Sequence, residues 1–318
     1  MQERSKTTME NFRLKVFRVV AGHLNFTRAA EELLLTQPAV TQQIKALEEE
    51  YGVPLFDRSG GRIALTPAGC ALLPYADRLK ALADEAFDVV TSVGGSHSGK
   101  LAVGASQTIG QYLLPNLIAA FLRENPRVAV SAISGNTDEM LEAVANHRIQ
   151  LALIEGPGLR KDLRIVPFME DQMVLVVPAS HEWADHEVRV ASLRGAPLLM
   201  REFGSGSRRV IENALAKAGL KKKDLTTVME LDSTEGLLSG VEAGLGVTFV
   251  SRWAVRNQLA LGTLRLAHVK ELRLSRMFSL AYPSGPELVG NAGAFYQFAL
   301  SRSLEQAPRA TGRSRRKE

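Results

Sequence analysis

The sequence predicts an α/β protein in which a small, largely helical N-terminal part precedes a larger part built on a mostly parallel sheet. Short apolar runs alternate with helical segments between residues 101 and 250, which is the pattern of such a sheet. Residues 12–48 show apolar side chains at helical spacing. A chain of 318 residues with 45% hydrophobic content is long enough for two or three domains.

The segment 36–48 predicts a short helix with two distinct faces. Its apolar positions recur at helical spacing and form one stripe, Val40, Ile44 and Leu47. Polar residues repeat every four positions on another face, and Gln, Thr and Lys are the types that bond base edges and phosphates in DNA. The alternative is a solvated amphipathic helix, but its neighbours favour a contact with DNA. The predicted DNA contacts on this helix are Thr36, Gln37, Pro38, Ala39, Thr41, Gln42 and Lys45.

The residues on either side predict the rest of a DNA-binding unit. Residues 25–33 form a second short helix capped by Asn25, and three residues then leave room only for a tight turn, which is helix-turn-helix spacing. An earlier helix supplies a supporting apolar stripe, Phe12, Val16, Val19 and Val20. Residues 55–58 and 62–66 flank Ser59-Gly60-Gly61 and predict a hairpin, a wing with Arg58 and Arg62 at its tip to meet phosphates.

These blocks resemble the winged helix-turn-helix of LysR-type transcriptional regulators. The similar blocks are Phe26-Thr27-Arg28-Ala29-Ala30, residues 36–44, Leu55-Phe56-Asp57-Arg58 and Leu65-Thr66-Pro67-Ala68-Gly69. The resemblance extends through most of the chain. We include Arg28, in the first block, among the predicted DNA contacts.

Composition restricts the class of protein. The single cysteine, Cys70, excludes an internal disulfide and any cysteine-rich metal site. The sequence shows no secretory signal and no run of about 20 apolar residues, so we expect a cytoplasmic protein without a membrane partner. The net charge of +5 is not a DNA signal, because residues 1–95 hold 11 Lys and Arg against 12 Asp and Glu. Most of the excess lies in residues 306–318, which predict a basic, disordered tail.

Residues 67–95 predict a helix for pairing two chains. Its apolar positions are spaced alternately by three and four, Leu72, Tyr75, Leu79, Leu82, Ala86, Val89 and Val93. The alternative, a helix packed on its own domain, normally shows a wider apolar stripe. Pro74 is expected to kink this helix or to mark where its regular part begins. The resemblance implies the family's linker helix, a dimer that reads an inverted repeat and a tetramer of two such dimers.

The larger part predicts two similar subdomains that face each other across a cleft. Ser106 and Thr108 correspond to Ser205 and Ser207 in a second half, and Thr137 corresponds to Thr234. Hydroxyls and free N–H groups at converging helix starts suit an anion, although each such residue is by itself a good helix cap. Arg201 or Arg208 supplies the countercharge in this interpretation. The predicted ligand contacts are Ser106, Gln107, Thr108, Asn136, Thr137, Glu155, Arg201, Ser205, Ser207, Arg208 and Thr234.

The resemblance implies that this part is the periplasmic-binding-protein-like effector domain of the LysR family. The blocks Thr108-Ile109-Gly110, Glu155-Gly156-Pro157 and Ala243-Gly244-Leu245-Gly246-Val247 are most similar to the branch that regulates sulfur assimilation or carbon fixation. The implied co-inducer is a small anion: a sulfur oxyanion, a carboxylate or a phosphorylated metabolite. Asp232 stands where a Gly is usual and adds negative charge near this pocket.

Catalytic patterns are incomplete. Residues 104–108 resemble a nucleophile elbow without its closing glycine, and His181 and His186 miss the zinc-protease spacing of four. We therefore expect no enzyme, no catalytic residue, no metal site and no cofactor.

The predicted organisation is a DNA-binding domain at 1–66, a linker helix at 67–95, an effector domain at 96–305 and the tail. Within the effector domain, subdomain I covers about 96–168 and 275–305, and subdomain II about 169–274. The predicted function is a regulator that binds double-stranded promoter DNA under control of the small anion, with RNA polymerase as a further partner. The alternatives are an architectural DNA-binding protein that needs no ligand and a cytoplasmic protein that binds small anions.

Overall fold

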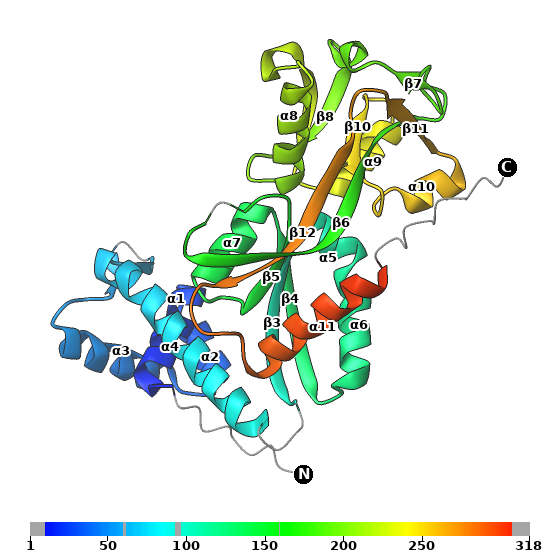
Figure 1. The fold of residues 1–318 in the computed structure, drawn as a ribbon. Coiled ribbons are helices and arrows are strands. Elements are labelled where there is room, and N and C mark those ends of the chain that lie inside the picture. Colours follow the sequence, from blue (N-terminus) through cyan, green and yellow to red (C-terminus); the bar gives the residue numbers. More distant parts are fainter. Residues whose placement is uncertain (1–9, 60–61, 93–96, 159, 307–318) are drawn as a thin grey trace. The chain divides into compact units, whose positions relative to one another are not determined.

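The computed structural model describes residues 10–59, 62–92, 97–158 and 160–306, and the chain divides into two compact units (Figure 1). The first unit contains the N-terminal residues to His97, and the second contains most of the chain from Ser98 onward. Gly60 and Gly61 of the predicted hairpin tip, Val93 of the predicted seam and residues 307–318 of the predicted tail lie outside the described residues.

Three helices form most of the first unit, α1 (Phe12–His23), α2 (Phe26–Leu33) and α3 (Gln37–Tyr51). The Asn25 side chain caps α2 by accepting the N–H groups of Thr27 and Arg28 at 2.9 and 3.1 Å. Thr36 caps α3 by accepting the N–H of Ala39 at 3.4 Å. Between them Leu34 adopts a left-handed backbone with φ 54°, which turns the chain within three residues. The predicted helix-turn-helix is confirmed.

The core of this unit is largely as predicted. Val40, Ile44 and Leu47 are buried, and the small residues Ala29 and Ala30 of α2 are buried too. The predicted stripe of α1 is wrong in part, because Phe12 is 48% exposed. Phe12 is the first residue of α1, and the buried row begins farther into the helix, at Leu14, Val16, Phe17 and Val20.

A short hairpin and a long helix follow. Strands β1 (Phe56–Asp57) and β2 (Ala64–Leu65) pair antiparallel, as expected for a wing. Helix α4 (Pro67–Ser92) continues through Pro74. Three side chains of the predicted seam are large, apolar and 51–62% exposed, Tyr75, Leu79 and Leu82. Such a row on one helix is what a partner helix would cover.

The second unit is built on a mixed sheet with the strand order β4-β3-β5-β12-β6-β11-β7. The expectation of a mostly parallel sheet is wrong, because β12 runs antiparallel to both of its neighbours, β5 and β6, and β10 and β11 also run antiparallel to β6. A separate parallel pair joins β8 and β9. The strands span Gly99–Ser106 (β3), Val128–Gly135 (β4), Leu151–Glu155 (β5), Leu163–Pro178 (β6), Glu187–Val188 (β7), Pro197–Arg201 (β8), Thr226–Leu231 (β9), Thr248–Ser251 (β10), Leu264–Val269 (β11) and Leu274–Pro283 (β12).

Helices cover both faces of each subdomain. Side chains of α6 and α11 pack on one face of β3 and β5, with Phe121 edge-on to Phe295 at 5.2 Å, and α7 packs on the other face. In the other subdomain α8 and α9 belong to separate buried clusters around β8 and β10. The helices span Gln107–Tyr112 (α5), Leu114–Glu124 (α6), Thr137–Ala145 (α7), Gly206–Lys217 (α8), Thr234–Glu242 (α9), Arg256–Leu261 (α10) and Gly290–Gln306 (α11).

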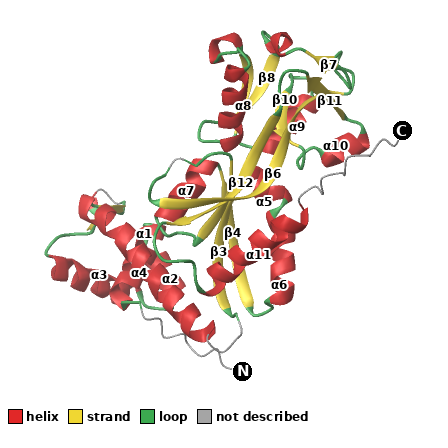
Figure 2. Cartoon of the chain, in the orientation of Figure 1, coloured by secondary structure: helices red, strands yellow, loops and turns green. Residues whose placement is uncertain are grey.

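Two long strands connect the subdomains. β6 and β12 pair side by side, and Figure 2 shows both running from one helical layer to the other. Phe168 and Phe278 belong to the core of the first subdomain, whereas Met173 and Leu274 belong to that of the second. Among the described helices, none is long and apolar enough to cross a membrane.

Candidate functional site

The outer face of α3 carries the residues that we predict to contact DNA. Gln37, Pro38, Gln42 and Lys45 are exposed, and Thr41 is half-buried. The Gln37 amide donates to the Thr41 hydroxyl at 3.4 Å, and that hydroxyl donates to the Gln37 carbonyl at 3.0 Å. These contacts hold two of the predicted side chains against each other on the exposed face. Arg28 on α2 is exposed as well, and Ala39 is half-buried.

The wing is joined to α3 by one carboxylate. Glu48 Oε1 accepts the N–H groups of Leu55 and Phe56 at 2.8 and 3.2 Å. The Arg58 guanidinium lies over the Phe26 ring at 4.6 Å and 3.6 Å from Glu48. Arg58 therefore braces the wing, whereas Arg62 is exposed and has no polar partner among the described residues.

In the larger unit, three of the predicted hydroxyls bond one acidic residue of the protein itself, Glu155. Glu155, at the end of β5, accepts the N–H groups of Thr108 and Ile109 at 2.6 and 3.2 Å through Oε1. The Ser207 hydroxyl donates to Oε2 at 2.9 Å. Ser106 and Thr137 lie 3.2 Å apart and bond the backbone N–H and C=O of Glu155. The start of α5 thus holds an oxyanion, as free N–H groups at a helix start favour.

The countercharge is a residue that the sequence analysis did not identify. Arg276 on β12 donates through Nη1 to Glu155 at 2.8 Å and to Ser207 at 2.6 Å, and through Nε to Asp171 on β6 at 2.7 Å. Its Nη2 lies 3.5 Å from the Thr108 hydroxyl. Ser251 donates to the other oxygen of Asp171 at 2.6 Å. One guanidinium therefore joins two buried carboxylates and the hydroxyls of both subdomains.

The two carboxyls respond in opposite directions to this environment. Burial acts to raise the pKa of Glu155, but Arg276, the Ser207 hydroxyl, Arg201 and the Ile109 N–H together lower it below its usual value. Burial is decisive for Asp171, whose pKa is raised although Arg276 and Ser251 oppose the effect. The lowered pKa keeps Glu155 ionised at neutral pH.

The remaining predicted contacts lie around this centre. Arg201 is buried and donates to the Thr234 hydroxyl at 3.1 Å and to Glu202. The Arg208 guanidinium donates to the Arg201 carbonyl, Glu230 and Glu212. Its Cζ lies 3.8 Å from the centre of the Phe203 ring. The guanidinium bonded to Glu155 is that of Arg276, and the countercharge role of Arg201 or Arg208 toward a bound anion stays a prediction. Ser205 caps α8, Asn136 accepts the N–H of Glu139, and Gln107 accepts from the Gln111 amide.

The subdomains touch directly at this place. A Cβ added to Gly206 would lie 1.7 Å from the Glu155 carbonyl oxygen, so only glycine permits this approach. Two contacts bridge the subdomains farther out: Arg209 pairs with Asp138 at 2.8 and 2.9 Å, and the Tyr112 hydroxyl donates to Glu235. Burial and the Glu235 carboxylate raise the pKa of Tyr112. A cavity of about 360 Å³ beside Arg276 is lined by Gly156, Pro157, Gly158, Ile165, Val210, Ser275, Met277 and Ser279.

Similarity to known proteins identifies both units. Residues 12–70 match the bacterial regulatory helix-turn-helix protein family, lysR type, and residues 94–303 match the LysR substrate binding domain. The chain belongs to the LysR family. It is 36% identical to a "Probable RuBisCO transcriptional regulator" of Cyanophora paradoxa, with 84% of each chain covered. That name agrees with the carbon-fixation half of the branch predicted from the sequence.

Solved LysR-type structures share the fold. Full-length CbnR complexed with its target DNA is 25% identical, with a TM-score of 0.68 over 93% of this chain and all of that one. The regulatory domain of Synechocystis PCC6803 CcmR, in complex with 2-PG, is 21% identical, with a TM-score of 0.61 over 66% of this chain and 99% of that one. This LysR-family protein is therefore a DNA-binding regulator with a fold of the same class.

The sequence does contain a signal for Arg276 and Asp171, a charged residue among apolar neighbours. Arg276 is the one charged residue of β12, and the residues two positions before and after both it and Asp171 in their strands are apolar. A lone Asp on β6 and a lone Arg on β12 are expected to pair if the strands are adjacent, because an unpaired buried charge is costly. The strands themselves were not predicted, so the pair was not recognised.

Proposed function

We propose that this protein is a sequence-specific transcriptional regulator whose promoter binding is controlled by a small anionic metabolite bound between the effector subdomains. The observation that carries the proposal is the convergence of two N–H groups, the Ser207 hydroxyl and Arg276 on the Glu155 carboxylate. This arrangement suits an oxyanion. An incoming anion either takes the place of the Glu155 carboxylate or binds beside it.

The relatives support a metabolite of carbon fixation as the first candidate. The CcmR regulatory domain binds 2-PG, and curated relatives of this chain are named as RuBisCO regulators. We propose the same class of ligand, a phosphorylated or carboxylated metabolite, with sulfur oxyanions as the next class to test. The predicted ligand contacts remain as proposed above, with Arg276 and Asp171 added.

The test of the ligand is a thermal-shift panel on the full chain with 2-phosphoglycolate, phosphate, sulfate, sulfite and thiosulfate. A ligand at about a hundred times its dissociation constant stabilises the folded state by about 2.7 kcal/mol. For a unit of this size the melting temperature rises by roughly 5–10 °C. The rise disappears in Ser106→Ala and Thr108→Ala and persists in Ser180→Ala, an exposed serine far from Glu155 in sequence. A flat panel removes the small anions as effectors and favours the ligand-independent architectural alternative.

We further propose that the exposed face of α3 reads base edges and that Arg28, Arg58 and Arg62 meet phosphates. The test measures binding of the full chain to a selected DNA site and to a scrambled site by fluorescence anisotropy. Gln37→Ala and Thr41→Ala each reduce the preference by roughly 1–3 kcal/mol. Gln43→Ala is the matched control, because Gln43 lies on α3 outside the predicted face. An unchanged preference in both variants refutes the assignment of α3 as the reader.

The assembly follows from the exposed seam of α4. We propose that Tyr75, Leu79 and Leu82 pair two chains in the cytoplasm, that two dimers form a tetramer on promoter DNA, and that RNA polymerase is a further partner. The proposed division of the chain is the predicted one: 1–66, 67–95, 96–305 and 306–318. Analytical ultracentrifugation of Leu79→Lys tests the pairing, since a charge in the seam is expected to yield monomers.

A further inference from the structure

A second hollow lies on subdomain II, apart from the Glu155 centre. It is a groove of about 570 Å³ between β6, β11 and the start of β12. β12 leaves β6 at the pair Leu274–Met173, and β11 takes its place beside β6 from the pair Ala267–Leu175 onward. The groove is the fork where the two strands separate. Its volume is in the range of sites for small molecules.

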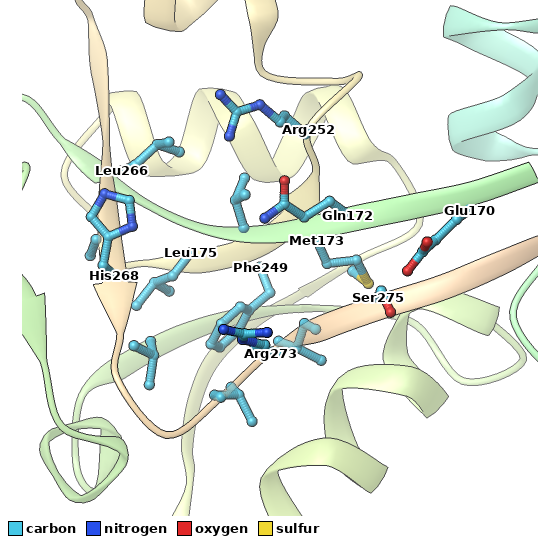
Figure 3. A pocket seen from close by; sticks show the side chains of 15 residues that line it. Glu170, Gln172, Met173, Leu175, Phe249, Arg252, Leu266, His268, Arg273 and Ser275 are labelled. Atoms are coloured by element: carbon cyan, nitrogen blue, oxygen red, sulfur yellow. The ribbon is translucent and has the colours of Figure 1, made fainter. Parts of the chain in front are cut away.

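The groove combines an apolar floor with unpaired cations. Figure 3 shows Arg252, His268 and Arg273 arranged around the groove. The half-buried side chains of Val174 and Leu266 line its floor. Neither the Arg252 guanidinium nor the Arg273 guanidinium has a hydrogen-bond or ion-pair partner in the described part of the chain. The backbone N–H of Arg252 donates to the Gln172 carbonyl at 2.8 Å. Glu170 and Ser275 lie at the opposite end from His268 (Figure 3). The positive end is suited to a carboxylate, sulfonate or phosphate, and the floor to an apolar body.

The groove residues are chain neighbours of the buried network. Glu170 and Gln172 flank Asp171, Ser275 precedes Arg276, and Arg252 follows Ser251. Successive side chains of a strand point to opposite faces. One face of the connecting strands therefore carries the Asp171–Arg276 pair, and the other contributes to the groove. Ser275 also lines the cavity beside Arg276.

We infer that this groove is a second binding site, which takes an organic anion with an apolar body. The anionic group lies among Arg252, Arg273 and His268, and the apolar part covers Val174 and Leu266. A ligand in the groove contacts the strands that join the subdomains, so it shifts their arrangement if it fits one arrangement better than another. The site is independent of the identity of the ligand at Glu155.

The experiment uses the full-length protein and two fluorinated probes of the same shape, 4-(trifluoromethyl)benzoate and the neutral 4-(trifluoromethyl)benzamide. Binding is measured by broadening of the ¹⁹F resonance, with a dissociation constant of roughly 1 mM expected for a ligand of this size. The benzoate binds more tightly than the amide. In the double variant Arg252→Met/Arg273→Met, benzoate binding weakens at least about fivefold and amide binding does not change, because methionine keeps the apolar stem.

Two controls locate the site. Arg256→Met changes an arginine that stacks on Trp253 at 3.9 Å and does not line the groove, so it leaves benzoate binding unchanged. Ser207→Ala alters the Glu155 centre and also leaves it unchanged. The inference is overturned by equal binding of the two probes, by full binding in the double variant, by loss of binding in Ser207→Ala alone, or by no broadening up to about 10 mM. Circular dichroism confirms that each variant is folded.

Discussion

Replacing Arg276 by methionine is the most informative perturbation of the effector unit. Arg276 is 5% exposed and is the guanidinium bonded to both Glu155 and Asp171. The methionine side chain fills much of the same volume, but the two buried carboxylates lose the positive charge that they share. Removing one partner of a buried charge pair typically costs 3–5 kcal/mol, of which the larger share is the cost of the uncompensated charges. We expect the free energy of unfolding to fall by about 4 kcal/mol at pH 7.5.

The stability of the wild type and that of the Arg276→Met variant are expected to change in opposite directions as the pH falls. In the wild type the pKa of Glu155 is lowered, so this group stabilises the fold at neutral pH and loses that effect as the pH falls through its folded pKa. Without Arg276, burial raises the pKa of Glu155 as it already raises that of Asp171. The folded variant then binds more protons than the unfolded chain, and its stability increases as the pH falls from 7.5 towards 5.5.

Urea unfolding followed by tryptophan fluorescence measures both effects. The two tryptophans, Trp183 and Trp253, are in the larger unit, so the signal reports on that unit. A loss of about 4 kcal/mol moves the midpoint by roughly 1.5–2 M for a slope of about 2–3 kcal/mol per molar urea. Arg160→Met is the control, because its pair with Asp162 is on the surface and is worth less than about 1 kcal/mol. A loss below about 1 kcal/mol in Arg276→Met, with the wild-type pH dependence, refutes the reasoning.

Three further predictions concern other parts of the chain. Gly206→Ala places a Cβ 1.7 Å from the Glu155 carbonyl oxygen, so it separates the subdomains; small-angle X-ray scattering of the variant should show a larger radius of gyration, and an unchanged radius contradicts the close contact. Asn25→Ala removes the cap of α2 and costs about 1 kcal/mol, measured by thermal unfolding of the first unit with Thr27→Ala as control. Leu47→Ala opens a cavity in the core of that unit and costs about 2–5 kcal/mol in the same assay; a cost near zero means that α3 does not pack as described.

The helix-turn-helix could be predicted in detail because its signals are local. Asn25 and Thr36 are caps that act on residues two or three positions away, and Val40, Ile44 and Leu47 mark a face within one helix. The hydroxyl residues at the helix starts of the effector unit were predictable for the same reason. Ser106, Thr137 and Ser207 all bond Glu155, the first two through its backbone and Ser207 through its carboxylate.

The strands β6 and β12 could not be predicted in the same way. Residues 163–178 include Pro167 and alternate irregularly, and their partner strand begins about a hundred residues later. Pairing at such separation leaves no local pattern. Without these strands there was no reason in the sequence to single out Arg276 and Asp171. Only Arg201 and Arg208, beside the predicted turn, could be named as candidate countercharges.

The same two strands set the order in which a growing chain acquires its parts. All the helices and strands of the reading unit come from its first hundred residues, so that unit is complete soon after it leaves the ribosome. The bond from Arg276 to Glu155 spans 121 residues, and the sheet of the effector unit is unfinished until β12 emerges. A chain interrupted before β12 would therefore carry a folded DNA-reading head without a finished sensor. Full-length synthesis is therefore needed to complete the effector unit.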